Sequence, residues 1–247
     1  MKEFAPKTTE QIAILNGLQR EPTHKAVLLY SGGADSTAAG LLLQDKGYAI
    51  HPIFFDYGQT ASEAEQFCVE KAAPLLGFEK PHIVQTDILK QISHSALLGD
   101  NAQNDTNAWV PGRNSVFMLL AGIYAHQIDA DGVSIGFMAS DQGVFGDSNI
   151  IHHKILETLL TQTLSRQMDV YTPLQNADKR KVLEILAERG AIDLTVSCWN
   201  AHVENSKIVI CGTCANCEER STNLHGIIYQ RPEAPVSNHQ SQMTNNA

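Results

Sequence analysis

Apolar and polar residues follow one another in blocks along most of the chain, and these blocks predict alternating strands and helices. The first apolar block, residues 26–30, has no charged member, which is typical of a strand buried on both faces of a parallel sheet. Further strands are predicted at 49–57, 82–86 and 133–138. Helical periodicity predicts helices at 37–46, 62–76, 114–127, 150–166 and 178–189, and a capping-box pattern predicts a short one after residue 8. This order indicates an α/β fold with a doubly wound parallel sheet.

The fold class also predicts where a ligand would bind. In an open parallel sheet, ligands bind beyond the carboxyl ends of the strands. The chain turns after Tyr30, Asp56 and Met138, so we expect these three turns at one edge of the sheet.

The first of these turns has the sequence Ser31-Gly32-Gly33-Ala34-Asp35-Ser36. Two glycines permit a tight turn whose N–H groups face an anion, and the N-terminus of the following helix adds a favourable dipole. The Ser31 and Ser36 hydroxyls can donate to phosphate oxygens, whereas the Asp35 carboxylate would repel a phosphate unless it holds Mg²⁺ or orients the loop. The turn therefore predicts a phosphate site, and a Gly-rich turn with a helix cap is the alternative.

Four of the five cysteines lie close together near the C-terminus: Cys198, Cys211, Cys214 and Cys217. Four thiolates in a tetrahedron at about 2.3 Å fit Zn²⁺ and leave no position for water, so we expect one structural zinc ion per chain. An iron–sulfur cluster and unligated thiols are the alternatives. The remaining cysteine, Cys68, is expected in the core.

Composition narrows the classes of protein. With 247 residues and 43% hydrophobic side chains, the chain can bury a core, which excludes a mainly disordered protein. The chain has a net charge of −9 and no run of Lys or Arg, so it lacks the positively charged surface that binds the phosphate backbone of nucleic acid. No apolar stretch approaches the roughly 20 residues that span a bilayer, and the N-terminus lacks a signal-peptide core. We therefore expect a cytoplasmic protein with neither membrane nor nucleic acid as partner.

The Ser-Gly-Gly-x-Asp-Ser turn resembles the pyrophosphate-binding loop (PP-loop) of the ATP pyrophosphatase superfamily, whose members split ATP between the α- and β-phosphates. Three further segments are similar to the 7-cyano-7-deazaguanine synthase (QueC) family, and the resemblance covers residues 27–226. These segments are Phe55-Asp56-Tyr57-Gly58-Gln59, Val110-Pro111-Gly112-Arg113-Asn114, and the run from Cys211 to Cys217 with Arg220 three residues on.

This resemblance implies an adenine nucleotide alpha hydrolase-like fold and an ATP-dependent carbon–nitrogen ligase. The implied reaction converts 7-carboxy-7-deazaguanine and ammonia to the nitrile preQ0 in the pathway to queuosine. Adenylation activates the carboxylate, ammonia displaces AMP, and a second adenylation activates the amide. The resemblance also implies one zinc per chain, ATP with Mg²⁺ as substrate, and a homodimer.

The resemblance assigns roles to individual residues. The pyrophosphate and its Mg²⁺ would be held by Ser31, Gly32, Gly33, Asp35 and Ser36. Asp56 and Gln59 would meet the nucleotide or shape its pocket. Arg113, next to Asn114, would give a two-pronged contact to phosphate or carboxylate, and Lys179 would neutralise phosphate. The implied catalytic set is Asp35, Ser36, Arg113 and Lys179.

Each of three residues has a structural alternative. Asp56 can be a turn acid, Arg113 a member of a surface ion pair, and Lys179 part of a solvated helix face.

Some segments depart from the family pattern. Residues 143–149 keep only Asp147 and an aromatic of a family segment that carries an arginine, and Lys179-Arg180-Lys181 replaces a family Lys-Ala-Glu. A paralog that adenylates another carboxylate, or joins a deazapurine to another amine or a protein acceptor, is therefore an alternative. A tRNA thiolase fits less well, because the net charge of −9 does not favour binding to RNA. A noncatalytic nucleotide-binding module held together by zinc also fits less well, because the chain retains Asp35, Asp56 and Arg113.

The expected organisation is an N-terminal helical extension at 1–24, a nucleotide-binding domain at 25–190, a zinc-binding segment at 191–230 and a disordered tail at 231–247.

His152 and His153 are expected on the surface, because neighbouring helical residues point to different faces and cannot form a metal pair. The loop at 99–109 is either an active-site lid or a solvated connection.

Overall fold

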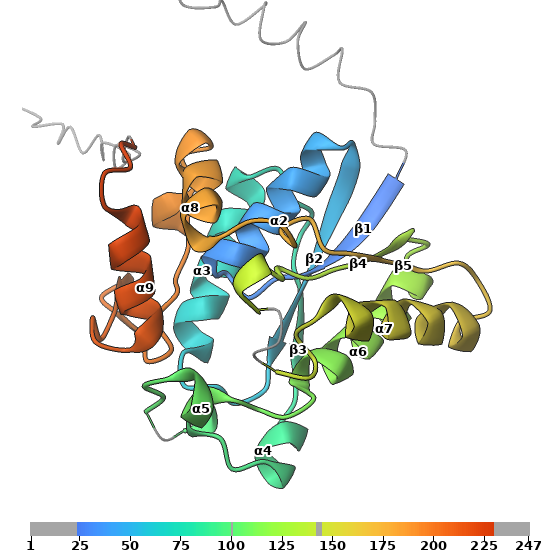
Figure 1. Cartoon of the computed structure of the whole chain (residues 1–247), viewed down its shortest axis with the longest axis horizontal. Helices are drawn as coiled ribbons and strands as arrows, with labels where there is room; N and C mark the ends of the chain where they lie inside the picture. The colour runs from blue at the N-terminus through green and yellow to red at the C-terminus, as the bar shows by residue number, and fades with distance from the viewer. Residues whose placement is uncertain (1–23, 100, 142–144, 230–247) are drawn as a thin grey trace, which may run out of the picture.

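The computed structural model describes residues 24–99, 101–141 and 145–229. Its centre is a parallel sheet of five strands in the order β3-β2-β1-β4-β5 (Figure 1). The strands are β1 (His24–Leu29), β2 (Tyr48–Asp56), β3 (His82–Gln85), β4 (Gly132–Ser134) and β5 (Asp169–Tyr171). The predicted α/β class with a doubly wound parallel sheet is confirmed.

Helices cover both faces of the sheet. The longer helices are α2 (Ala34–Asp45), α3 (Ser62–Leu75), α6 (Arg113–Gln127), α7 (Ile150–Thr163), α8 (Lys179–Glu188) and α9 (Ala215–Leu224). Short helical turns are α4 (Ile88–Ile92), η1 (Ala96–Leu98), α5 (Asp105–Ala108), η2 (Ala139–Asp141) and η3 (Ile192–Leu194). A small antiparallel pair, β6 (His202–Glu204) and β7 (Lys207–Val209), precedes α9.

The unbroken apolar character of β1 has a direct cause in the packing. Ala26 and Leu28 are buried in a core shared with α2, α3 and α8, whereas Val27 is buried in a second core shared with α6 and α7. Successive side chains of a strand point to opposite faces, so a central strand must be apolar at every position. Figure 1 shows the two helical layers on either side of the sheet.

Several predictions differ from the structure: helix α7 ends at Thr163 rather than at residue 166, and β6, β7 and α9 were not predicted. Strand β4 ends at Ser134 rather than at residue 138, because the chain leaves the sheet and approaches the start of α2. Strand β5 was missed, since three residues are too few to show periodicity. Helix α2 begins at Ala34, three residues earlier than predicted, so the second half of the Gly-rich turn is already helical.

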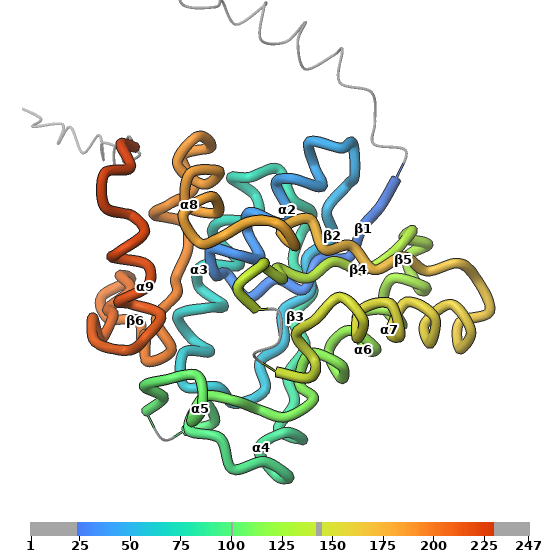
Figure 2. Tube along the Cα trace, viewed as in Figure 1, coloured from blue at the N-terminus to red at the C-terminus, as the bar shows by residue number. Residues whose placement is uncertain are grey.

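The C-terminal part of the described chain packs beside the nucleotide-binding sheet rather than within it. Helix α9 lies against α8, and β6 lies against α3 (Figure 2). A small core around the cysteines joins this segment to the start of α3. Within the described residues, none of the helices is both long and apolar enough to cross a membrane. The helix predicted after residue 8 and the predicted tail at 231–247 lie outside the described residues.

Candidate active site

A cleft of about 580 Å³ lies at the carboxyl ends of β1, β2 and β4, as predicted from the sheet. Most of the residues predicted from the sequence line it: Ser31, Gly33, Asp35, Ser36, Gln59, Arg113, Asn114 and Lys179. Gly32 and Asp56 do not line the cleft. Helix α9 and the segment before it also contribute, through Ser197, Trp199, Asn216 and Glu219.

The Gly-rich turn presents the N-terminus of α2 to this cleft. Gly33 is the N-cap, and no side chain caps the first amides of the helix. The Ser31 and Ser36 hydroxyls lie 3.2 Å apart at the same point. Uncapped N–H groups at a helix N-terminus, flanked by hydroxyl donors, form a site for an anion such as phosphate.

Gly32 is required for the shape of the turn rather than for contact with a ligand. Its φ of +69° lies in the left-handed region. A Cβ there would lie 2.8 Å from the Glu65 carbonyl oxygen and 2.9 Å from Cys68 Cβ. The carbonyl of Gly32 accepts a hydrogen bond of 3.0 Å from the backbone N–H of Val196, so the turn is tied to the C-terminal segment.

The loop after β4 supports the same turn from the other side. A Cβ on Gly136 would lie 2.7 Å from both the Asp35 carbonyl carbon and the Ser36 nitrogen. Only glycine allows this close approach of two backbones. Gly136 was not identified from the sequence, because nothing in the local pattern shows which helix a loop will touch.

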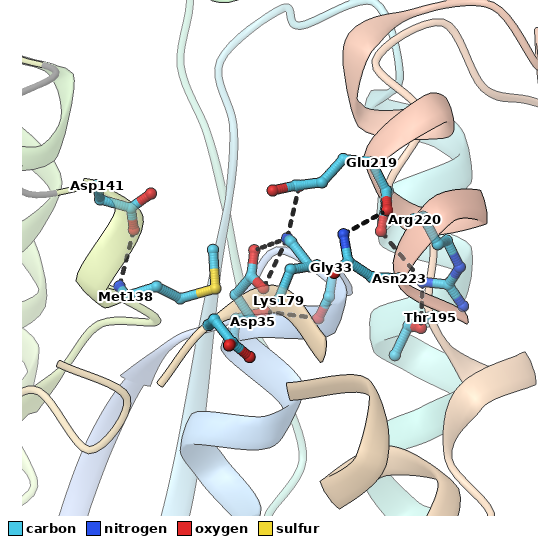
Figure 3. A network of polar contacts seen from close by, with 12 residues as sticks. Gly33, Asp35, Met138, Asp141, Lys179, Thr195, Glu219, Arg220 and Asn223 are labelled. Carbon is cyan, nitrogen blue, oxygen red and sulfur yellow. Dashed lines mark hydrogen bonds and ion pairs between the residues drawn. The ribbon is translucent and has the colours of Figure 1, made fainter. Parts of the chain in front are cut away.

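Lys179 lies between two carboxylates at the floor of the cleft (Figure 3). Its Nζ donates to Asp35 Oδ1 and Oδ2 at 2.8 and 2.9 Å, and it lies 3.2 Å from Glu219 Oε2. Burial disfavours the charge of Lys179, but the two ion pairs outweigh it and raise its pKa. Lys179 is only 8% exposed, so the solvated helix face considered as its alternative is wrong.

A third carboxylate, Asp141, lines the same cleft and is within electrostatic range of this ion-pair group. Its Oδ2 accepts a hydrogen bond of 2.8 Å from the Met138 N–H (Figure 3). Burial, together with the charges of Asp35 and Glu219, raises the pKa of Asp141 to about 6, against the opposing effects of the Met138 hydrogen bond and of Lys179. Asp141 can therefore exchange a proton near neutral pH. Neither Asp141 nor Glu219 was singled out from the sequence.

On the β2 side, Gln59 is a buried structural residue that holds a carboxylate in the cleft. Its amide oxygen accepts from the Tyr57 N–H at 2.9 Å, and its Nε2 donates to the Phe55 carbonyl at 3.1 Å and to Glu65 Oε2 at 2.8 Å. Burial raises the pKa of Glu65, although Gln59 and Arg113 oppose this. Asp56 accepts from the Gly58 N–H at 3.3 Å, which matches its alternative role as a turn acid.

Arg113 begins α6 and points across the cleft toward β2. Its Nη1 donates to the Tyr57 hydroxyl at 2.9 Å, and its guanidinium carbon lies 5.8 Å from the centre of the Tyr57 ring. The interaction with Tyr57, with Glu65 and Asp147 contributing, raises the pKa of Arg113, which therefore stays charged. Arg113 is thus part of the cleft wall, and the surface ion pair considered as its alternative is wrong.

Asp147 and Asn149, within the stretch that departs from the family pattern, have local structural contacts. Asp147 Oδ2 accepts from the Asn114 N–H at 3.2 Å, at the start of α6. Asn149 caps α7 by accepting from the His152 N–H at 2.9 Å. The described part of the stretch contributes Phe145 and Ser148 to the cleft and no cation.

The prediction that both adjacent histidines lie on the surface is wrong for His153. His153 is 2% exposed and lines the cleft, whereas His152 is partly buried and bonds to Ser115. The described part of the 99–109 loop contains the short helix α5; Ala102 and Ala108 are buried, and Asp105 lies on the cleft wall. It is therefore a packed part of the site rather than a wholly solvated connection.

Arg220 fixes α9 against the segment that enters the cleft. Its Nη1 donates to the Thr195 and Ser197 hydroxyls at 3.0 and 3.1 Å, and its Nη2 donates to the Ile192 carbonyl at 2.8 Å. Figure 3 shows this side chain directed toward Thr195, away from Lys179. Arg220 therefore positions Ser197 and Glu219 without lining the cleft itself.

The four cysteine sulfurs converge as predicted. The Sγ atoms of Cys198, Cys211, Cys214 and Cys217 all lie within 4.8 Å of one another. Four sulfurs around one ion at about 2.3 Å would be about 3.8 Å apart, so the donor set fits a single tetrahedral ion. A four-iron cluster places each thiolate on a different iron and therefore needs a wider spacing.

Backbone N–H groups donate to the sulfurs at this site, although burial raises the pKa of Cys198 and Cys217. The Cys211 and Asn200 N–H groups donate to Cys198 Sγ at 3.3 and 3.4 Å. Burial alone would raise the pKa of Cys211, but hydrogen bonds from its neighbours lower it to about 6. Cys68 is buried in the core as predicted, and burial raises its pKa to about 12.

The parallel sheet and a cleft that joins the uncapped N-terminus of α2 with Lys179 and Arg113 are typical of a nucleotide-binding α/β protein. The family model for the queuosine biosynthesis protein QueC matches residues 25–227, and the chain belongs to this family. It is therefore an ATP-using enzyme of the PP-loop type.

Several solved structures are similar at low identity. The U34-tRNA thiolase NcsA from Methanococcus maripaludis with its [4Fe-4S] cluster has 15% identity and a TM-score of 0.48, with 84% of this chain and 68% of that chain covered. A 4-thiouridine synthetase–RNA complex with bound ATP has 22% identity and a TM-score of 0.43, with 70% and 42% covered. A predicted subunit of tRNA methyltransferase from Methanocaldococcus jannaschii has 19% identity and a TM-score of 0.43, with 67% and 75% covered.

Proposed function

We propose that this protein is a carbon–nitrogen ligase that converts 7-carboxy-7-deazaguanine and ammonia to 7-cyano-7-deazaguanine at the expense of ATP. The observation that carries the proposal is that, in a chain of the QueC family, one cleft combines the uncapped N-terminus of α2 with Lys179 and Arg113. Such a cleft can bind a triphosphate and stabilise the pyrophosphate that leaves it.

The first half of the reaction makes an amide. A carboxylate oxygen attacks the α-phosphorus of ATP, the bond to the β-phosphate oxygen breaks, and pyrophosphate leaves toward the N-terminus of α2. Ammonia then attacks the carboxyl carbon, and AMP leaves with the electron pair of the C–O bond. The nitrogen must lose a proton, and Asp141, with its pKa raised to about 6, is placed in the cleft to accept it.

The second half makes the nitrile. The amide oxygen attacks the α-phosphorus of a second ATP, and pyrophosphate leaves again. Loss of AMP with the oxygen, together with two N–H protons, forms the carbon–nitrogen triple bond. Each cycle therefore consumes two ATP and releases two AMP and two pyrophosphate ions.

ATP would bring Mg²⁺, which neutralises phosphate charge when bound. In the described part of the chain, the four cysteines are the only set of three or more metal-ligating side chains close enough to share an ion. A magnesium ion would therefore take most of its ligands from phosphate and water, and one or two carboxylates would complete the set. We propose Asp35 for this role, with Lys179 as its partner in the protein alone.

We further propose that Cys198, Cys211, Cys214 and Cys217 hold one zinc ion with a structural role. A closed set of four thiolates supplies no open position, so the ion would stabilise the segment that carries Ser197 and Glu219 rather than act on substrate. Metal analysis of the purified protein should find one zinc per chain, and a brown iron chromophore would contradict the proposal.

The test of the function is mass spectrometry of the products formed from 7-carboxy-7-deazaguanine, ATP and ammonium. The expected products are the nitrile and AMP. The Asp35→Ala variant should release pyrophosphate at least 100-fold more slowly, whereas the control Lys181→Ala, an exposed lysine on α8, should behave as the wild type. No AMP from the wild type would contradict the proposal.

The second candidate is a paralog that adenylates a different carboxylate, or joins a deazapurine to another amine or a protein acceptor. It is favoured by the described part of 143–149, which places no cation in the cleft where the family segment has an arginine. AMP formation without the nitrile would support this candidate. A tRNA thiolase is disfavoured because it needs a reactive cysteine or a cluster, and the buried Cys68 has its pKa raised to about 12.

We also propose a homodimer and a cytoplasmic location, as the resemblance and the composition suggest. Helices α6 and α7 expose large apolar side chains along their length: Val116, Leu120, Ile123, Ile151, Ile155 and Leu159. Such a surface favours burial against a second copy. Light scattering should give twice the chain mass for the wild type and one chain mass for Ile155→Glu, and a monomeric wild type would contradict the proposal.

A further inference from the structure

Glu65, on helix α3, is a carboxylate of the cleft wall that the mechanism above does not use. It is partly buried and lines the cleft. Its backbone lies beside the Gly-rich turn, because its carbonyl oxygen is 2.8 Å from the position of a Cβ on Gly32. A carboxylate at this point repels phosphate groups, so binding of the triphosphate does not account for it.

One oxygen of the Glu65 carboxylate is held by the protein and the other is free. Oε2 accepts a hydrogen bond of 2.8 Å from Gln59 Nε2, and the Gln59 amide is itself fixed by the Tyr57 N–H and the Phe55 carbonyl. Oε1 has no hydrogen-bond partner among the described residues, and it is not one of the fully buried polar atoms that lack a partner. A ligand in the cleft can therefore reach Oε1 on a carboxylate that is already held in place.

No cation neutralises Glu65 by direct contact, since it forms no ion pair with any described residue. The Arg113 guanidinium shares the cleft but donates to the Tyr57 hydroxyl instead. Burial raises the pKa of Glu65, and the Gln59 hydrogen bond and the charge of Arg113 do not offset this effect. N–H donors on a ligand would stabilise the carboxylate and supply the partners that the protein lacks.

The two substrates of the proposed reaction differ in the edge that their rings present. The pyrimidinone ring of 7-carboxy-7-deazaguanine has a ring N–H next to an amino group, so two neighbouring donors match the two oxygens of one carboxylate. Adenine has an amino donor next to a ring acceptor, and a carboxylate repels that acceptor. Glu65 therefore suits the acid rather than the base of ATP.

The wall next to Glu65 suits a flat ring. The Tyr57 and Phe117 ring centres lie 5.0 Å apart, and Phe55 stacks on Phe117 at 4.5 Å. All three side chains line the cleft, and the Phe55 carbonyl accepts from the same Gln59 amide that holds Glu65. A planar heterocycle can therefore contact apolar side chains while its polar edge meets the carboxylate.

We propose that Glu65 is a specificity residue, which accepts hydrogen bonds from the ring N–H and the amino group of the heterocyclic acid that is adenylated. The identity of this acid rests on the proposed function. In 7-carboxy-7-deazaguanine the carboxylate is on the other ring, so it points away from Glu65 when the amino edge faces this residue. This orientation leaves Lys179 and the N-terminus of α2 to ATP.

The first experiment compares two acids that differ by one group, because 7-carboxy-7-deazahypoxanthine lacks only the amino group of 7-carboxy-7-deazaguanine. In the wild type, this loss should raise the KM for the acid about tenfold or more. Glu65→Gln keeps an acceptor for Gln59 but removes the charge. It should raise the KM for 7-carboxy-7-deazaguanine by a similar factor and change the KM for ATP less than about twofold. The two acids should then have nearly equal KM values in this variant.

The control Glu63→Gln changes an exposed acid on the same helix and should behave as the wild type. A purely structural role for Glu65 would weaken the binding of both acids alike. The proposal is therefore overturned if Glu65→Gln prefers the acid with the amino group as strongly as the wild type does. A loss confined to the KM for ATP would also overturn it, because Glu65 would then belong to the nucleotide site.

A second measurement separates this proposal from the proposed function. Calorimetric titration of the whole chain follows the binding of 7-deazaguanine and 7-deazahypoxanthine, which are the bare rings without a carboxylate. The wild type should bind 7-deazaguanine about tenfold or more tightly, and Glu65→Gln should bind the two rings equally. If the wild type shows this preference but makes no AMP with the acid, the proposed function fails and the ring site stands. If the nitrile forms but the amino group affects neither turnover nor binding, the proposed function stands and the proposal for Glu65 is wrong.

Discussion

Lys179 is the residue on which the charge balance of the cleft depends. It is the buried cation between Asp35 and Glu219, and its charge also acts on Asp141 in the same cleft. Its removal would leave carboxylates that repel both one another and an incoming triphosphate.

Lys179→Met should therefore lower the rate of pyrophosphate release about 100-fold and raise the KM for ATP. Lys181→Met, on the same helix, is the matched control, because that side chain is exposed and has only a 3.8 Å contact with Glu184. Both variants should be compared in a pyrophosphate-release assay. Equal rates for the two variants would show that Lys179 is not needed at the cleft.

The titration of Asp141 should make the rate of the reaction fall at acidic pH. The raised pKa of about 6 means that its carboxylate is lost as the pH falls through this value. The kcat/KM of the wild type should fall below pH 6, whereas Asp141→Asn should be slower throughout and lack this fall. The measurement is a pH–rate profile of both proteins. If kcat/KM falls below pH 6 in both, a group other than Asp141 causes the fall.

Asp141→Asn, which should slow the reaction, should also make the folded protein more stable above pH 6. Between pH 4 and pH 6 the folded protein binds the Asp141 proton more tightly than the unfolded chain does, so this residue lowers stability as the pH rises through the window. At pH 8, Asp141→Asn should be more stable by on the order of 1 kcal/mol, a rise of about 2–4 °C in Tm, and the two proteins should unfold alike at pH 4.

The residues of the site differ in how far the sequence reveals them. A short motif contains Ser31, Gly33 and Ser36. This motif and the apolar strand before it are enough to predict that these residues line the cleft. Glu219 and Asp141 reach the cleft from distant segments, and no local pattern distinguishes them from solvated acids. His153 was misplaced because the side of a helix that faces a cleft is decided by packing against Phe137, which is not adjacent in sequence.

At the scale of elements, the sequence predicts long, periodic segments well and short ones poorly. Helices α3 and α6 begin and end within about one residue of their predictions, because many buried apolar positions define them. Strands β4 and β5 have three residues each, so their extent is set by pairing with neighbours rather than by their own pattern.

The contact between the loop after β4 and α2 makes a prediction for these elements. In Gly136→Ala, the new Cβ would meet the backbone of Asp35 and Ser36 at 2.7 Å, so the first turn of α2 must move. We expect a loss of about 1–3 kcal/mol in the free energy of unfolding and a higher KM for ATP. Gly146→Ala is the control, because a Cβ there meets nothing within 4 Å. Thermal unfolding with and without ATP checks both effects.

At the scale of the whole molecule, the cysteine segment and the sheet form one site. Gly32 accepts a hydrogen bond from Val196, and Arg220 holds Ser197 beside the cleft. The sequence indicated a metal-binding segment and a nucleotide-binding sheet separately. Their junction could not be predicted, because it depends on how α9 packs against α8.

Removal of the metal should therefore impair nucleotide binding as well as local structure. Cys214→Ser should contain well below one zinc per chain and bind ATP more weakly, because Glu219 and Ser197 lose their support. Cys68→Ser, the matched control, should keep its zinc. Metal analysis and calorimetric titration with ATP test this, and normal ATP affinity in zinc-free Cys214→Ser would contradict it.

The hydrogen bond between Gly32 and Val196 also bears on how the protein is made. The ribosome releases the Gly-rich turn early, but the residues that complete its surroundings, from Val196 to Glu219, emerge more than 160 residues later. A nascent chain, or a product truncated before this segment, would carry the turn without the finished cleft. The cleft therefore takes its final form only when the segment from Val196 to Glu219 has joined the turn.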